Sequence, residues 1–201
     1  IVYTEGLKNP RKTDKATSKG NFEKGRLAIL IDESSASASE VLTGAVQDWD
    51  RGIVVGRRSF GKGLVQRPIP LNDGSMIRLT IARYYTPTGR SIQRPYDEGN
   101  DKYNSDFLDR FNHGELQHAD SIVFPDSLKK ETLVSKRVVY GVGGIMPDIL
   151  IPIDTTRITD YHKNVMYKGV LNRTVLNYVD TNRDMLLETY PEFDDFKDNF
   201  M

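Results

Sequence analysis

Two short apolar runs, residues 26–32 and 52–56, enclose a segment in which apolar residues recur at helical spacing. Continuous apolar runs bounded by turn-forming residues are typical of strands that are covered on both faces in an α/β sheet. The residues between the runs that fall on one helical stripe are Val41, Leu42, Ala45, Val46 and Trp49. This order predicts a parallel strand, helix, strand crossover and therefore an α/β fold.

Partial alternation of apolar and polar residues predicts a β-hairpin after this unit. Its strands are residues 64–71 and 76–85, and an Asn-Asp-Gly-Ser turn joins them. Pro68 places the first strand at a sheet edge, since proline cannot donate a ladder hydrogen bond. Ahead of the first apolar run, residues 5–25 are rich in Lys, Asn, Thr, Ser and Gly and are predicted to form an exposed loop.

The second half of the main domain is more polar and less regular. Residues 95–140 are predicted to be a surface insertion that contains a short helix at 106–111. Further strands are predicted at residues 137–140 and 149–152, on either side of a glycine-rich turn.

The end of the chain differs in pattern from the rest. Residues 156–201 carry aliphatic and aromatic residues at roughly helical spacing, which predicts two helices and a docking or dimer surface. A homodimer is therefore one candidate assembly. The expected organisation is one main domain, residues 1–155, followed by a helical extension, residues 156–201.

Composition removes several function classes. Lys plus Arg and Asp plus Glu each number 28, so no net field draws the chain to nucleic acid or to an anionic membrane. The absence of cysteine excludes disulfides, thiolate zinc sites and a cysteine nucleophile. The three histidines, His113, His118 and His162, lack the spacing of a metal pair on a helix, so no metal and no cofactor is expected. No apolar stretch reaches the length of a membrane span.

Ser37 and Lys62 are the residues whose surroundings suit chemistry. A serine hydroxyl becomes nucleophilic when a base takes its proton, and a lysine can be that base if burial lowers its pKa. Ser37 lies where the strand meets the helix, so the N–H of Ala38 is an expected oxyanion donor. Lys62 lies between two glycines, and Phe60 and Leu64 are expected to bury its amine.

The segments that contain Ser37 and Lys62 also have other interpretations. Ser37-x-x-Glu40 is the pattern of a capping box, in which the serine only begins the helix. The stretch from Gly56 to Lys62 is close to a phosphate-binding loop, but residue 63 is Gly where Ser or Thr is required. A strand, not a helix, is expected to follow it, so nucleotide binding is not predicted.

The motifs nevertheless occur in an order that resembles one family. Ser35-Ala36-Ser37-Ala38-Ser39-Glu40 is followed by Phe60-Gly61-Lys62-Gly63-x-Val65-Gln66, by Thr86-Pro87-x-Gly89-Arg90-Ser91-Ile92-Gln93 and by Gly144-Ile145-x-Pro147-Asp148. This series is similar to that of the carboxyl-terminal processing, or tail-specific, serine peptidases. The resemblance implies that Ser37 is the nucleophile, Lys62 the general base and Gln66 the residue that orients the lysine. Glu40 and Asp48 are interpreted as structural.

The same resemblance implies a crotonase- or ClpP-like α/β fold, of which residues 1–155 would be the C-terminal part of the catalytic domain. It also implies a serine endopeptidase that cleaves exported or envelope proteins near their C-termini, in the periplasm or cell envelope. The family's PDZ domain and upstream glycine-rich segment have no counterpart in these residues. The alternatives are a non-proteolytic peptide- or ligand-binding scaffold on the same fold, or a fragment that is inactive without its upstream half.

Overall fold

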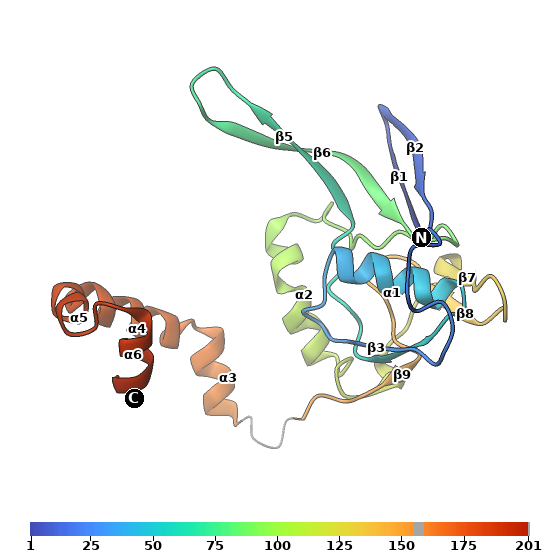
Figure 1. Cartoon of the computed structure of the whole chain (residues 1–201). Coiled ribbons are helices and arrows are strands. Elements are labelled where there is room, and N and C mark those ends of the chain that lie inside the picture. Colours follow the sequence, from blue (N-terminus) through green and yellow to red (C-terminus); the bar gives the residue numbers. More distant parts are fainter. Residues whose placement is uncertain (155–158, 201) are drawn as a thin grey trace. The chain divides into compact units, whose positions relative to one another are not determined.

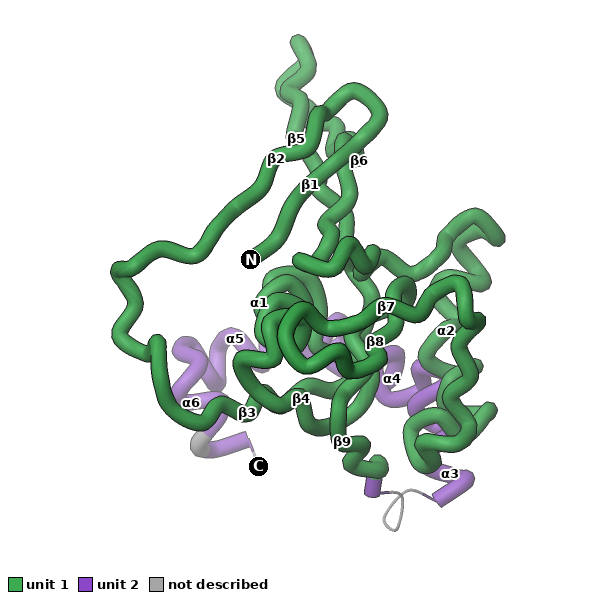
Figure 2. Tube along the Cα trace, turned by 90° about the vertical axis from the view of Figure 1, so that its right-hand side faces the viewer, with its two compact units in different colours: residues 1–153 green, residues 154–201 purple. Residues whose placement is uncertain are grey.

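The computed structural model describes residues 1–154 and 159–200. The chain divides into two compact units, residues 1–153 and 154–201, which are coloured separately in Figure 2 and are described here one at a time. The predicted boundary between the domain and the extension, at residues 155 and 156, lies outside the described residues.

A small parallel sheet forms the centre of the first unit (Figure 1). Its strands are β3 (Ala28–Ile31), β4 (Ile53–Gly56) and β9 (Ile149–Leu150), in the order β3-β4-β9. Helix α1 (Ala38–Asp48) connects β3 to β4, which pair in parallel with Ile29 opposite Val54. The predicted crossover and the mixed α/β class are therefore confirmed.

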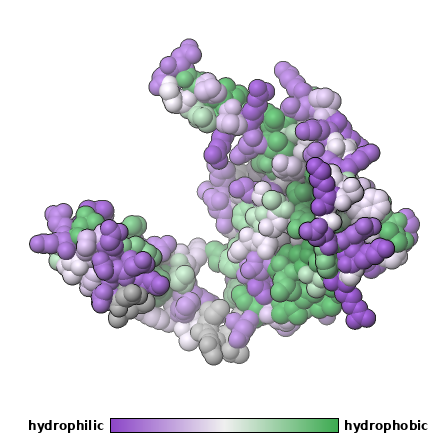
Figure 3. Space-filling view, in the orientation of Figure 1, coloured by the Kyte–Doolittle hydropathy of each residue, from purple (hydrophilic) through white to green (hydrophobic). Residues whose placement is uncertain are grey.

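The core lies on one face of this sheet. Ile31, Val54, Ile92 and Ile145 are buried together there. On the other face, among the described residues, Leu30 is 79% exposed, and Figure 3 shows apolar surface gathered over these strands. The prediction that residues 26–32 are covered on both faces is wrong, because successive side chains of a strand point to opposite faces and α1 packs against one of them.

A second, antiparallel sheet has the order β2-β1-β6-β5. It consists of β1 (Val2–Gly6), β2 (Asn9–Asp14), β5 (Leu64–Pro70) and β6 (Met76–Tyr85). The predicted hairpin is confirmed as β5 and β6, and it extends away from the body of the unit in Figure 1. The prediction of a loop over residues 5–25 is wrong for residues 9–14. These form an edge strand whose mostly exposed side chains need no apolar alternation.

The residues after position 95 form α2 (Asn100–Asn112), two 3₁₀ turns (Ala119–Ser121 and Asp126–Leu128) and the two-stranded ribbon of β7 (Lys129–Glu131) and β8 (Val138–Tyr140). The helix is longer than the predicted 106–111, because polar residues at its N-terminal end hid its start. Within this segment Arg110, Leu116 and Thr132 are buried. It therefore makes contacts with the interior as well as with solvent.

The second unit is helical, with α3 (Asp160–Tyr167), α4 (Val170–Thr181), α5 (Arg183–Thr189) and α6 (Phe193–Asn199). Two helices were predicted here. The chain forms four shorter ones because it turns at Gly169, which has a left-handed backbone, at Asn182, and at residues 190–192. Tyr190, Phe196 and Phe200 form an aromatic cluster. None of the described helices is long and apolar enough to cross a membrane.

Position 56, at the end of β4, requires a glycine because the backbone of β3 passes very close to it. Its φ is 128°, and a Cβ atom there would overlap the carbonyl oxygen of Ile31. We expect Gly56→Ala to lower the free energy of unfolding by about 3 kcal/mol or more, because both backbone strain and overlap must be relieved. Urea unfolding measures this loss.

Gly20→Ala is the matched control, because no atom lies within 4 Å of a Cβ at that position. Its expected effect is within about 0.5 kcal/mol. Equal unfolding midpoints for the two variants would show that β3 and β4 are not packed in this register.

Candidate active site

Ser37 occupies a strained turn between β3 and α1. It is the N-cap residue of α1, with φ of 58° and ψ of −114°. A positive φ is uncommon for a residue with a side chain and persists only where the surroundings fix it. Here the loop is fixed by Asp32, whose carboxylate accepts hydrogen bonds from the N–H groups of Ser34 and Ser35 at 3.0 Å. The Ser37 side chain is exposed at this junction.

The Glu40 side chain takes its part in the predicted capping box, because it accepts a hydrogen bond from the Ser37 N–H at the start of α1. Yet the Glu40 carboxylate does more than cap the helix. It is 1% exposed and accepts from four donors. Its Oε2 atom accepts from the N–H groups of Ser37 and Lys62, each at 2.8 Å. Its Oε1 atom accepts from the Ser59 hydroxyl at 2.5 Å and from the Gly61 N–H at 2.6 Å.

This shared carboxylate brings the two sequence-predicted residues together. Since the backbone nitrogens of Ser37 and Lys62 both lie 2.8 Å from one oxygen atom, they are no more than twice that distance apart. The two residues are 25 positions apart in the chain, as 62 − 37 = 25. Charge-assisted hydrogen bonds of this kind are among the stronger polar contacts in proteins. Glu40 therefore fixes the spacing of the two backbones.

The rest of the Lys62 loop is also held through its backbone. The N–H of Gly63 donates to the Gln93 side-chain oxygen at 2.9 Å. The carbonyl oxygens of Gly61 and Gly63 accept from the N–H groups of Arg94 and Tyr84, at 3.0 Å and 2.8 Å. Gly63 leads into strand β5, as expected for a loop that does not bind phosphate. These bonds leave the loop backbone little freedom.

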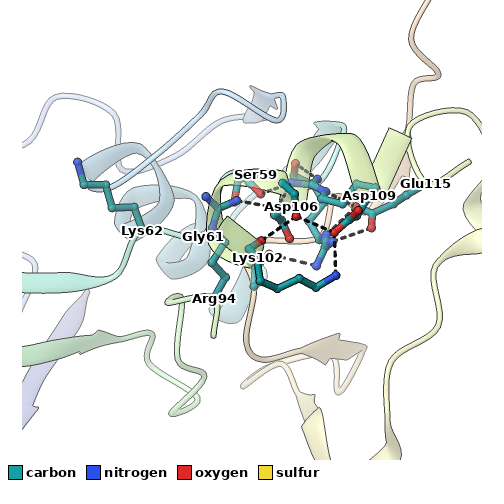
Figure 4. A network of polar contacts seen from close by, with 12 residues as sticks. Ser59, Gly61, Lys62, Arg94, Lys102, Asp106, Asp109 and Glu115 are labelled. Carbon is teal, nitrogen blue, oxygen red and sulfur yellow. Dashed lines mark hydrogen bonds and ion pairs between the residues drawn. The ribbon is translucent and has the colours of Figure 1, made fainter. Parts of the chain in front are cut away.

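The Lys62 side chain, in contrast, is exposed. It extends away from the polar network that surrounds Ser59 and Gly61 (Figure 4), and its amine makes no hydrogen bond or ion pair with the described residues. The prediction that its neighbours bury it is wrong. Phe60 instead packs under Arg94, whose guanidinium carbon lies 4.1 Å from the ring centre, and against Tyr103. The flanking glycines are buried but have no side chains to cover the amine.

Gln66 and Ala38 lie near this site without contacting it. Gln66 is exposed on β5, and the pairing with β6 shifts between Val65 and Gln66. Its amide makes no hydrogen bond to Lys62 among the described residues. Ala38 is the first residue of α1, where a backbone N–H has no acceptor within the helix. That N–H remains available to a ligand.

Asp48, at the far end of α1, ties the helix to the rest of the unit. It forms a buried ion pair with Arg90 and accepts the Thr88 N–H at 2.8 Å. Burial lowers the pKa of Arg90, and the Asp48 carboxylate opposes this change. These residues are remote from Ser37 in the helix, so their role is to hold α1 in place.

The histidines lie elsewhere. His113, His118 and His162 are all exposed, in the segment after α2 and in α3. No group of three or more His, Cys, Asp or Glu residues within residues 1–154 and 159–200 is arranged to hold a metal ion. The candidate site is therefore the group of residues around Glu40, namely Ser37, Ser59, Gly61 and Lys62.

Sequence reasoning missed three of the residues that build this site. Glu40 was seen only as a capping residue, whereas Gln93 and Arg110 were not singled out. The capping pattern was the one local signal for Glu40. Its bonds to the Lys62 loop span 19 to 22 positions and left no trace in residue spacing.

Comparisons with known proteins agree with the order of motifs. Residues 1–98 match the profile of peptidase family S41, and residues 161–201 match a family of unknown function (DUF8443). A chloroplastic C-terminal processing peptidase of Tetradesmus obliquus is 50% identical over 68 residues, which are 34% of this chain and 15% of that protein. A carboxy-terminal-processing protease of Bartonella bacilliformis is 54% identical over 67 residues, 33% of this chain and 15% of that protein.

Two further matches extend over more of the chain. A carboxyl-terminal-processing protease of Synechocystis is 38% identical over 94 residues, 47% of this chain and 22% of that protein. A solved structure of a photosystem II D1 C-terminal processing protease matches 75% of this chain and 27% of its own, at 26% identity and a TM-score of 0.49. The chain thus spans less than a quarter of the length of these curated relatives.

The α/β crossover places a serine at the start of its helix and the backbone of a lysine beside it. Residues 1–98, just under half of the chain, match peptidase family S41.

Proposed function

We propose that this chain carries the nucleophile and the base of a serine endopeptidase. The observation that supports the proposal is the Glu40 carboxylate, which binds the backbone N–H groups of Ser37 and Lys62 through one oxygen. A nucleophile and its base must meet within hydrogen-bond reach. A common anchor on both backbones supports the proposal, because it keeps the two residues close enough for a lysine side chain to reach the hydroxyl.

In the proposed reaction, the Ser37 hydroxyl oxygen attacks the carbonyl carbon of a peptide bond while its proton passes to the Lys62 amine. The N–H of Ala38 stabilises the oxyanion. The carbon–nitrogen bond then breaks, and Lys62 returns the proton to the leaving amine. Water hydrolyses the resulting Ser37 ester, with Lys62 again acting as the base. Gln66 is proposed to accept a hydrogen bond from the lysine and to fix its rotamer.

The exposed Lys62 places a condition on this mechanism. A lysine in water is protonated at neutral pH, because its ordinary pKa is about 10.4. We propose that bound polypeptide covers Lys62 in the whole protein and that this desolvation favours the uncharged amine that a base requires.

The remaining assignments follow from the family. We propose a crotonase-like catalytic domain, of which residues 1–155 form the C-terminal part, with residues 156–201 as an extension that could support a homodimer. The substrates would be exported or envelope proteins cleaved near their C-termini, in the periplasm or cell envelope. The names of the curated relatives, which include bacterial and chloroplastic C-terminal processing proteases, support cleavage near C-termini.

A fluorophosphonate probe on the whole protein tests the proposal. We expect labelling at Ser37 and loss of labelling in Ser37→Ala. Labelling should be unchanged in Ser39→Ala, because Ser39 is the second residue of α1 and is not part of the strained turn. Mass spectrometry of the labelled peptide measures each outcome. Absence of labelling from folded protein would instead favour a binding scaffold on this fold, for which the exposed Lys62 is the supporting observation.

A further inference from the structure

Arg110, on helix α2, is bound to the loop that carries Lys62. Its side chain is 5% exposed, and all three of its nitrogens donate hydrogen bonds. Nη2 donates to the Arg58 carbonyl at 2.6 Å, and Nη1 donates to the Ser59 carbonyl at 3.2 Å. These two carbonyls immediately precede the Phe60-Gly61-Lys62 segment. The planar fork of an arginine suits two neighbouring acceptors in a way that lysine cannot match.

Glu115, in the turn after α2, completes the attachment. Its carboxylate receives the Arg58 guanidinium through two bonds of 2.6 Å and the Arg110 Nε at 2.8 Å. Burial lowers the pKa of Arg110, Arg58 lowers it further and Glu115 raises it. The carboxylate is therefore what allows two arginines to lie side by side in a largely buried position.

A second attachment lies on the other side of the loop. Arg94 donates to the Asp106 carboxylate of α2 at 2.6 Å (Figure 4). Its guanidinium carbon also lies 4.1 Å from the ring centre of Phe60 and 3.8 Å from that of Tyr103. Its backbone N–H donates to the Gly61 carbonyl at 3.0 Å. Helix α2 thus contacts the loop at its start, through Arg110, and near Lys62, through Arg94.

These contacts are made to other atoms of the loop than those that Glu40 binds. Glu40 of α1 binds the Ser59 hydroxyl and the N–H groups of Gly61 and Lys62, whereas Arg110 binds the carbonyls of residues 58 and 59. The loop is therefore held by Glu40 of α1 and by Arg110 of α2. Helix α2 begins at Asn100, beyond residues 1–98 that match the family profile.

We propose that α2 is a positioning element for the Lys62 loop, and that Arg110 is its principal positioning residue. The inference rests on the proposed function, because it concerns the placement of the base that acts on Ser37. Arg110 touches neither the substrate nor the reacting atoms. It sets the position of the loop backbone, from which the lysine side chain reaches the serine.

The test compares Arg110→Gln and Arg110→Lys with Lys102→Ala in the whole protein. Lys102 is on the same helix, but its ion pair with Asp109 is exposed and does not contact the loop. Hydrogen exchange of the peptide amides over residues 59–63 is the first measurement. In Arg110→Gln these amides should exchange at least about tenfold faster, because two loop carbonyls lose donors, and a 1.4 kcal/mol change in local opening is a tenfold change in exchange.

The second measurement is the rate of Ser37 acylation by the fluorophosphonate probe across pH. In Arg110→Gln we expect a rate about 10 to 100 times lower at each pH, because the loop that carries Lys62 is displaced. Arg110→Lys, which keeps the charge beside Glu115, should fall between the wild type and Arg110→Gln. It also serves as the test if Arg110→Gln does not fold.

Unchanged exchange in folded Arg110 variants, or equal changes in Lys102→Ala, would overturn the inference. The exchange experiment does not depend on peptidase activity. If the wild-type protein is not labelled at Ser37, the proposed function fails, whereas the attachment of the loop to α2 is still tested. If labelling occurs but neither exchange nor the pH profile responds to Arg110, only the present inference fails.

Discussion

In Lys62→Ala, acylation of Ser37 in the whole protein should be about 100 to 10,000 times slower at neutral pH, the range over which general bases contribute. The free energy of unfolding should change by less than about 0.5 kcal/mol, as for other exposed positions. The reason is that the loop is held through the N–H of Lys62 and the carbonyls of its neighbours, while the side chain makes no polar contact within the described residues. Probe kinetics and urea unfolding measure the two effects.

Arg67→Ala is the control for this prediction. Arg67 is also exposed, lies five positions further along on β5, and is not part of the proposed mechanism. Its acylation rate should equal that of the wild type. If Lys62→Ala is acylated as quickly as Arg67→Ala, then another group takes the proton of Ser37.

Glu40→Gln should impair both stability and reaction. A carboxylate accepts at both oxygens, whereas an amide accepts at one and would direct its NH₂ group toward donors. At least two of the four donors, among Ser37, Ser59, Gly61 and Lys62, would then lack a partner. Since each buried donor left unsatisfied costs about 1–3 kcal/mol, we expect a loss of about 2–6 kcal/mol in the free energy of unfolding.

Acylation should also slow in Glu40→Gln by about 100-fold or more, because the common anchor of the two backbones is lost and small displacements have effects of this size. Glu33→Gln is the matched control. Glu33 lies in the same strand-to-helix loop, but it pairs with Arg57 rather than with the Lys62 loop. Its acylation should be unchanged. Equal losses in the two variants would contradict a specific role for Glu40.

Local pattern was sufficient to predict the crossover and the hairpin. The runs at 26–32 and 52–56 are apolar because their strands contribute Ile31 and Val54 to the core, so the pattern and the burial have one cause. Strand β2 was not predictable in this way. It lies at a sheet edge with mostly exposed side chains, and its pairing with β1 depends on backbone bonds that residue type does not encode.

The candidate site was predictable in its residues but not in its supports. Motif order predicted Ser37 and Lys62 as site residues, and the structure shows that their backbones are close. Phe60 does not cover the Lys62 amine because its ring packs against Arg94 and Tyr103. These residues are 34 and 43 positions further along the chain (94 − 60 and 103 − 60). Contacts over such separations leave no local signal in the sequence. The polar sequence of α2 likewise gave no sign that Arg110 binds the loop.

The most direct test of the central claim is the structure of the whole protein with a boronate bound to Ser37. The account predicts that the Lys62 amine lies about 2.6–3.2 Å from the Ser37 hydroxyl oxygen, covered by the bound inhibitor or by polypeptide. A boronate on Ser37 with the amine of Lys62 still pointing into solvent would contradict it.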